Sequence, residues 1–380
     1  MKNKIVFLTG TRADFGKLRP LIEKIEFSKN FECYIFVTGM HTLERYDFTY
    51  QEVMKRGYKN IFVFMNQSNS PKQDIILANT VVGLSNFVNE ISPNMIIVHG
   101  DRIEALSGAI VGSFNNILVC HIEGGELTGS IDEMIRHSIS KLSHIHMVSN
   151  SKAKKRLLQM GESKNSIFVI GSPDIDVMIG NTLPSKKQLC QTYQITFSKY
   201  AVLIFHPVTT NIHTLKNDVA QLLKAIKNSR KNYVVIFPNN DPGSEIILKA
   251  YENLKNNERI KIFSSLRFDF FLTLLKNSDF IIGNSSSGIT EAEIYGVPSI
   301  NIGSRQKNRS ANKNIINVEC KSTKIIDAIN SISTKKFKKS YNFGNGKSAD
   351  KFLKLINDKK IWKTPIQKQF IDNSEKFNYL

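Results

Sequence analysis

The sequence predicts an α/β protein with two doubly wound, Rossmann-like domains that face each other across a cleft. Short apolar runs rich in Val and Ile recur along the whole chain, and segments with the helical spacing of apolar residues lie between them. Strands and helices that alternate in this way form parallel sheets with right-handed crossovers and helices on both faces. The length of 380 residues exceeds one ordinary core and fits two domains of about 150 to 200 residues each.

Strands are expected at apolar runs that mostly end in Gly, Ser, Asn or His. In the first half they are residues 5–10, 33–39, 95–100, 117–125, 144–150 and 167–172. In the second half they are residues 200–208, 233–240, 260–266, 280–287, 299–303 and 315–320. Turn residues interrupt the pattern in GSPDIDVMIGNTLPSKKQ (171–188). We therefore predict an N-terminal domain at 1–175, a C-terminal domain at 176–350 and a helical tail at 351–380 that packs back on the first domain.

Composition is ordinary for a globular protein in water, with 41% apolar and 22% charged residues. The apolar run near the N-terminus, IVFLT, is shorter than the roughly seven residues of a secretory signal and the about 20 of a membrane span. We expect a cytoplasmic protein with no membrane partner. The cysteines lie far apart without a CxxC pair, which argues against a zinc knuckle and a disulfide framework. We expect no metal and no cofactor.

The formal net charge of +19 fits either a nucleic-acid partner or an anionic small substrate such as a nucleotide. The lysines are spread over the whole chain rather than gathered in one stripe. This distribution favours the small substrate and no nucleic-acid partner. A non-catalytic, basic nucleic-acid-binding module remains the alternative from another class of protein.

Two loops resemble phosphate sites. GTRADFGKL (10–18) is not a P-loop, because five residues separate its glycines and Leu18 follows Lys17. It is either a plain turn or a glycine loop in which Arg12 and Lys17 hold an anion at a helix N-terminus. The second loop predicts a pyrophosphate site at a helix that starts near Gly288; its sequence is IIGNSSSGITEAEIYGVPSINIGSRQ (281–306). Glu291 is expected to accept hydrogen bonds from a ribose, and Arg305 is expected to pair with a phosphate. The serines of this loop are Ser285, Ser286 and Ser287.

Further candidates follow other strands. In HGDRIEA (99–105), Asp101 is either a base in the cleft or half of a structural pair with Arg102. In FHPVTT, His206 is either structural or catalytic, and Asn239 in FPNND lies at the same level. CHIEGGELTGSIDEMIRH (120–137) groups the carboxylates Glu123, Glu126, Asp132 and Glu133. Such a group indicates a metal site, acid/base chemistry or a solvated turn, and Asp132 with Arg136 has the spacing of a helix ion pair.

Together, TGTRADFGKL, HGDRIEAL, HIEGGELTGSIDEMIRHSISKLSHIH, IGSPDID, FHPVTT and GNSSSGITEAEIYGVPSINIGSRQKNR resemble the hydrolysing UDP-N-acetylglucosamine 2-epimerases of bacterial sialic acid synthesis. The resemblance runs in order from the first strand to about residue 310. It implies a glycosyltransferase-B type of fold with UDP in the cleft, and a homo-oligomer, either a dimer or a tetramer. In this family a base removes the C2 proton while UDP leaves, giving 2-acetamidoglucal, and water then adds to yield free N-acetylmannosamine.

The resemblance carries three carboxylates over to this chain, Asp101, Glu123 and Asp132, and we add His206 as a catalytic candidate. The predicted substrate and UDP contacts are Arg12, Lys17, Arg102, Arg136, Asn239, Ser285, Ser286, Ser287, Gly288, Glu291 and Arg305. The C2 proton is a poor acid, so its removal needs a positioned carboxylate with a raised pKa. The adjacent glycines Gly124 and Gly125 are expected to let the backbone approach the sugar.

Three related activities remain open on these motifs. A hydrolysing enzyme of legionaminic acid synthesis would act on UDP-2,4-diacetamido-2,4,6-trideoxyglucose, which differs at C4 and C6 of the sugar. A non-hydrolysing epimerase would return UDP-N-acetylmannosamine, although EGGELTGSIDEMIRH resembles the hydrolysing branch. A glycosyltransferase would share the fold but would not need this set of carboxylates.

Overall fold

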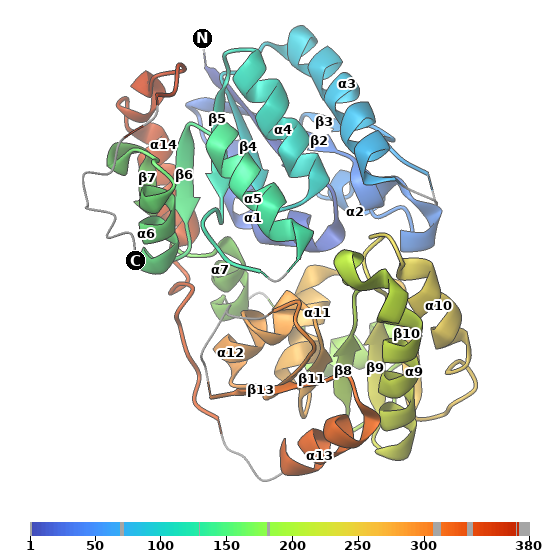
Figure 1. Cartoon of the computed structure of the whole chain (residues 1–380). Coiled ribbons are helices and arrows are strands. Elements are labelled where there is room, and N and C mark those ends of the chain that lie inside the picture. The colour runs from blue at the N-terminus through green and yellow to red at the C-terminus, as the bar shows by residue number, and fades with distance from the viewer. Residues whose placement is uncertain are drawn as a thin grey trace.

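The computed structural model describes residues 2–68, 72–128, 130–180, 183–306, 313–332, 337–369 and 371. It contains two parallel sheets, each covered by helices on both faces, and the two domains lie one above the other in Figure 1. The predicted fold class is therefore confirmed.

The first sheet has the strand order β3-β2-β1-β4-β5-β6-β7, and all its neighbouring strands are parallel. Its strands are β1 (Asn3–Thr9), β2 (Phe31–Val37), β3 (Ile61–Val63), β4 (Met95–His99), β5 (Leu118–Ile122), β6 (Ile145–Val148) and β7 (Ile167–Val169). The order reverses between β1 and β4, and crevices for ligands form at such a switch point. All six predicted strands are present. β3 was not predicted; it is a three-residue edge strand with two exposed side chains.

Helices cover this sheet in the order that the apolar spacing predicts. They are α1 (Arg12–Glu26), α2 (Tyr50–Met54), α3 (Gln73–Ile91), α4 (Ile103–Phe114), α5 (Ile131–Leu142), α6 (Ser151–Gln159) and α7 (Pro173–Ile179). Helix α1 begins after Thr11, whose hydroxyl accepts the Asp14 N–H at 3.0 Å. Helix α5 begins after Ser130, which caps the N–H of Asp132. These caps fix the start of the helices that line the cleft.

The second sheet has the order β10-β9-β8-β11-β12-β13 and is also parallel. Its strands are β8 (Ala201–Ile204), β9 (Tyr233–Ile236), β10 (Ile260–Phe263), β11 (Ile281–Gly283), β12 (Ser299–Ile302) and β13 (Ile315–Val318). The helices are α8 (Lys186–Tyr193), α9 (Ile212–Asn228), α10 (Ser244–Glu252), α11 (Phe268–Lys276), α12 (Glu291–Tyr295) and α13 (Ser322–Ile332). Each strand lies at a predicted run.

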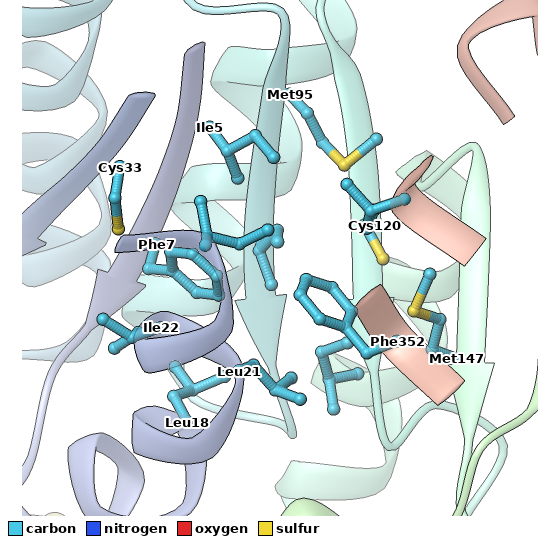
Figure 2. Packing of buried hydrophobic residues seen from close by; sticks show 14 of the residues in the cluster. Ile5, Phe7, Leu18, Leu21, Ile22, Cys33, Met95, Cys120, Met147 and Phe352 are labelled. Atoms are coloured by element: carbon cyan, nitrogen blue, oxygen red, sulfur yellow. The ribbon is translucent and has the colours of Figure 1, made fainter. Parts of the chain in front are cut away.

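The chain crosses back to the first domain after α13, as the red segment of Figure 1 shows, and ends there with α14 (Ser348–Asn357). In Figure 2, Phe352 of this helix lies among the strands of the first sheet, and its ring is 6.3 Å from that of Phe7. Trp362 stacks on Phe31 with ring centroids 5.9 Å apart. Helix α7 contacts α1 and α14 and also contributes Ile175 to the core of the second domain.

The predicted domain boundaries at 175 and 350 stay predictions. Helices α7 and α14 lie close to these boundaries, and α7 contacts both domains. Of the predicted helical tail, the described part after α14 contains only the short turn Ile361–Lys363, and residues 370 and 372–380 lie outside the described residues. In the described part of the chain, no helix has the length and apolar character needed to cross a membrane. All four cysteines are free, and Cys33 and Cys120 are buried.

Gly283 marks where the second sheet meets the serine loop, and its φ of +131° is rarely open to other residues. A Cβ here would lie 1.8 Å from the Ile204 carbonyl oxygen of β8. We expect Gly283→Ala to lower the free energy of unfolding by about 3 kcal/mol or more, measured by urea denaturation. Gly57→Ala is the control, because Gly57 also has positive φ but open space around it, so only about 1 kcal/mol is expected. Equal losses at both positions would contradict the packing argument.

Candidate functional site

A cavity of about 220 Å³ lies where the carboxyl ends of the strands of both domains meet. Its lining includes most of the predicted residues: Lys17, Asp101, Arg102, Glu123, Asp132, Arg136, His206, Asn239, Ser285, Ser286, Ser287, Glu291 and Arg305. The first domain supplies the carboxylates Asp101, Glu123 and Asp132, and the second supplies the serine loop. The cavity therefore places candidate acid/base groups opposite a candidate nucleotide site.

Glu123 follows β5 in a left-handed conformation, with φ of +63°. Such a conformation costs a residue other than glycine about 1–2 kcal/mol and is found where function requires a particular side-chain direction. The predicted approach of a sugar to the glycines that follow it stays a prediction, but their packing gives another reason for glycine at both positions. A Cβ on Gly124 would meet His121 Nδ1 at 2.9 Å, and one on Gly125 would meet the Ala153 carbonyl oxygen at 2.5 Å. They let the loop pack tightly on its own domain.

Two neighbours hold the Glu123 carboxylate. His99 Nε2 lies 3.1 Å from Glu123 Oε2, and His99 Nδ1 lies 3.1 Å from Asp14 Oδ1. Burial disfavours the charged ring, but Glu123 and Asp14 together raise the pKa of His99 to about 10. On the other side, the Ser172 hydroxyl contacts both Glu123 and Asp174. Glu123 thus lies between an imidazolium and a hydroxyl group.

Lys17 connects this group to the nucleotide side of the cavity. Its Nζ lies 3.3 Å from Asp174 Oδ2 and 3.1 Å from Glu291 Oε1. Burial opposes its charge, but Glu291 and Asp174 raise the pKa of Lys17, so the ammonium is retained. Burial raises the pKa of Asp174 to about 6 against the lowering effect of Lys17. The predicted anion-holding lysine is thus already paired with carboxylates of the protein.

Asp101 and Asp132 are each paired with an arginine, but not as their sequence spacing suggested. Arg136 pairs with Asp101 and donates to the Glu126 carbonyl oxygen at 3.1 Å. Asp132 pairs instead with Arg305 of the other domain, at 2.9 Å. Burial and the nearby Asp101 raise the pKa of Asp132, while Arg305 lowers it. The i, i+4 pair of Asp132 and Arg136 was a wrong alternative, because both side chains point into the cleft toward other partners.

His206 follows β8 and is fixed by its backbone and by one ring nitrogen. Its N–H donates to Asn284 Oδ1 at 2.7 Å, and Asn284 Nδ2 donates back to the His206 carbonyl oxygen at 2.9 Å. The Asn239 N–H donates to His206 Nδ1 at 3.1 Å, so the ring proton is on Nε2. Burial, Arg305 and Arg102 lower the pKa of His206 well below its usual range. The ring is therefore a neutral hydrogen-bond donor rather than a base.

The serine loop differs in detail from the expected helix N-terminus. Ser286–Gly288 form a 3₁₀ turn, and the following helix, α12, is only five residues long and begins at Glu291. A Cβ on Gly288 would lie 2.6 Å from Ser299 Oγ, so this glycine packs against β12 and does not line the cavity. Burial disfavours an ionised Glu291, but Lys17 and Thr290 lower its pKa. Glu291 is therefore a charged acceptor beside the three serines.

Arg12 lies outside the cavity lining. Its guanidinium pairs with Glu52 and donates to Ser265 Oγ at 2.7 Å, which joins the first domain to the second. Arg102 does line the cavity, and it donates across the cleft to Asn240 Oδ1 at 3.0 Å. The predicted UDP contact of Arg12 stays a prediction.

Four residues at the centre of this network were not among the predicted site residues: Asp14, His99, Ser172 and Asp174. All four lie at or shortly after the end of a predicted strand and inside quoted motifs: Asp14 in TGTRADFGKL, His99 in HGDRIEAL, and Ser172 and Asp174 in IGSPDID. Their position at strand ends was therefore a usable signal. The contacts among these residues could not be predicted from the sequence, because residues 49 positions apart, such as Glu123 and Ser172, meet only in the folded protein.

Two Rossmann-like domains with carboxylates and a serine loop in one cleft define a sugar-nucleotide enzyme of the glycosyltransferase-B type. The sequence profile of the UDP-N-acetylglucosamine 2-epimerase family matches residues 23–357, and the chain belongs to this family. It is 46% identical to the UDP-N-acetylglucosamine 2-epimerase of Neisseria meningitidis serogroup B, over 97% of this chain and 99% of that protein.

A second relative acts on another sugar nucleotide. The UDP-N,N'-diacetylbacillosamine 2-epimerase (hydrolyzing) of Legionella pneumophila is 31% identical, over 94% of this chain and 96% of that protein.

Among solved structures, the UDP-GlcNAc 2-epimerase of Methanocaldococcus jannaschii in complex with UDP-GlcNAc and UDP superposes with a TM-score of 0.80 at 25% identity. This superposition covers 93% of the present chain and 99% of the Methanocaldococcus chain.

Proposed function

We propose that this protein is a hydrolysing UDP-N-acetylglucosamine 2-epimerase that forms N-acetylmannosamine and UDP, for the sialic acid synthesis that its motifs indicate. The observation that carries the proposal is the cavity itself, which places Glu123, Asp101 and Asp132 opposite the serine loop and Glu291. The 46% identity to the meningococcal 2-epimerase supports the same activity.

The first half of the reaction removes the C2 proton and expels UDP. Glu123 is the base in this proposal, because its carboxylate lines the cavity and is held in position by His99 and the Ser172 hydroxyl. Arg305 reaches the Asn284 carbonyl oxygen at 3.3 Å, next to the serines, where it can neutralise the departing diphosphate. His206 Nε2–H adds a neutral donor, and Glu291 accepts from the ribose hydroxyls.

The second half adds water across the double bond of 2-acetamidoglucal. Epimerisation requires that C2 receive its new proton from the face opposite to the one that lost it. Asp132 is the proton donor in this proposal, because burial and Asp101 raise its pKa and so favour the acid. Asp101, paired with Arg136, then orients the water whose hydroxyl adds to C1 and accepts the proton that this water loses.

The product identifies the activity. Incubation with UDP-N-acetylglucosamine, followed by proton NMR, should show free N-acetylmannosamine and UDP in equal amounts. A non-hydrolysing epimerase would instead accumulate UDP-N-acetylmannosamine. Salt-sensitive nucleic-acid binding without any turnover would replace the proposal by the basic-module alternative.

The 31% identity to the Legionella enzyme favours one second candidate, the hydrolysis of UDP-2,4-diacetamido-2,4,6-trideoxyglucose. The same chemistry at C1 and C2 would serve both sugars, and only the contacts at C4 and C6 would differ. A parallel assay with this substrate separates the two. A higher kcat/KM for the diacetamido sugar would assign the protein to legionaminic acid synthesis.

We further infer a cytoplasmic homo-oligomer, a dimer or a tetramer, that binds a UDP-sugar and no nucleic acid. A cytoplasmic location fits a biosynthetic enzyme whose substrate is a nucleotide sugar, and the oligomer follows from the family resemblance. Light scattering coupled to size exclusion measures the mass directly, and a single monomeric species would contradict the oligomer.

A further inference from the structure

Asp14 occupies the first turn of α1 and lines the cavity, although the proposed mechanism gives it no step. Its Oδ2 accepts the Gly10 N–H at 3.0 Å, and its own N–H donates to Thr11 Oγ1 at 3.0 Å. These bonds hold the carboxylate in one orientation. Its second oxygen, Oδ1, then lies 3.1 Å from His99 Nδ1.

We propose that Asp14 is a positioning residue that acts on Glu123 through His99. The chain of contacts runs from Asp14 Oδ1 to His99 Nδ1, and from His99 Nε2 to Glu123 Oε2, with 3.1 Å at each step. Nε2 forms a hydrogen bond with Glu123, whereas Nδ1 lies at ion-pair distance from Asp14 Oδ1 without the geometry of a hydrogen bond. Two carboxylates on opposite sides of an imidazole favour its protonated form. The inference rests on the proposed function, in which Glu123 reacts at C2.

The surroundings of His99 support a charged ring. Asp14 approaches it from α1 and Glu123 from the end of β5, and the remaining close group, His121, is held neutral. His121 donates from one ring nitrogen to the Gly100 carbonyl oxygen, and burial lowers its pKa to about 3. Lys17 and Asp174 face Glu123 on its other side. Among the described residues, the charged groups that act most strongly on the His99 ring are thus the two carboxylates of Glu123 and Asp14.

The charged ring has two consequences for Glu123. A charge-assisted hydrogen bond is about twice as strong as a neutral one, so it fixes a carboxylate whose backbone is already in a strained conformation. The positive charge also lies beside the carboxylate that is to accept the C2 proton. Without Asp14, a neutral His99 could still donate one N–H to Glu123, but it would supply no charge.

The test is Asp14→Asn, because asparagine keeps the shape and retains an oxygen to accept the Gly10 N–H. We expect kcat to fall at least about tenfold and KM to change less than about twofold. The alkaline limb of the pH profile should move down by at least about one pH unit, since His99 then loses its proton more easily. Asp74→Asn is the matched control, the same change in the first turn of α3 at an exposed side chain, and it should leave all three quantities unchanged.

A second measurement needs no substrate and so separates this inference from the proposed function. The NMR titration of the His99 ring, assigned by its loss in His99→Gln, should show a ring that stays protonated through neutral pH. In Asp14→Asn the same ring should titrate at lower pH. If the ring titrates identically in both proteins, the inference fails whatever the enzyme does.

The double variant tests whether Asp14 acts through His99. If it does, Asp14→Asn combined with His99→Gln should be no slower than His99→Gln by itself. A double variant whose loss of kcat equals the product of the losses in the two single variants would overturn the positioning role of Asp14. So would wild-type kcat and pH profile in Asp14→Asn, provided that the wild-type enzyme turns over.

Discussion

Glu123→Gln is expected to lower the turnover of UDP-N-acetylglucosamine by about 10³-fold or more. Glutamine has the size of glutamate, but its single carbonyl oxygen can accept from only one of the two donors, His99 or Ser172, which contact different oxygens of Glu123. It cannot take a proton from C2, so the elimination that releases UDP does not begin. Both UDP release and N-acetylmannosamine formation should therefore fall together.

The measurement is UDP release under saturating substrate, compared with UDP affinity by calorimetry. Glu133→Gln provides a matched control, because this half-buried side chain accepts the Thr128 N–H, which glutamine also accepts, and otherwise lies 3.8 Å from His137 of its own helix. Unchanged UDP affinity with lost turnover is the expected pattern. Turnover within about tenfold of wild type would exclude Glu123 as the base.

Asp132→Asn is expected to separate the two halves of the reaction. If Asp132 supplies the proton to C2, its loss should lower N-acetylmannosamine formation by about 10²-fold or more, while the elimination still occurs. UDP release should then exceed N-acetylmannosamine formation, and 2-acetamidoglucal should accumulate. Asparagine can still accept the hydrogen bond from Arg305, although without its charge assistance.

Proton NMR of the reaction mixture detects the vinyl proton of 2-acetamidoglucal directly. Equal losses of UDP and N-acetylmannosamine, without the intermediate, would contradict the assignment of Asp132 to the second half. That outcome would place Asp132 beside Glu123 in the elimination step, where it would act together with Arg305 on the leaving group.

The strand pattern was readable from sequence for a physical reason. Strands buried on both faces of a parallel sheet appear as continuous apolar runs, and every predicted run contains a strand. β3 was missed because it is short and lies at the sheet edge. Strand ends were informative because parallel strands bring their carboxyl ends to one edge, which gathered Asp101, Glu123 and His206 into one cavity.

Charge pairing was not readable from sequence, because it depends on how the two domains face each other. Asp132 pairs with Arg305, 173 positions away, rather than with Arg136 on its own helix. Arg12 pairs with Glu52, 40 positions away, which only the fold brings near. The protonation of His206 depends on a backbone N–H from Asn239, and the sequence contains no signal for such a contact.

Reaction in deuterated water tests the central claim, that the cavity performs proton abstraction at C2 with hydrolysis of the bond to UDP. The account predicts free N-acetylmannosamine with deuterium at C2 and one UDP per sugar, with no deuterium incorporated by Glu123→Gln. N-acetylmannosamine that retains its original proton at C2 would contradict it, because the sugar would then have been epimerised without the removal of that proton.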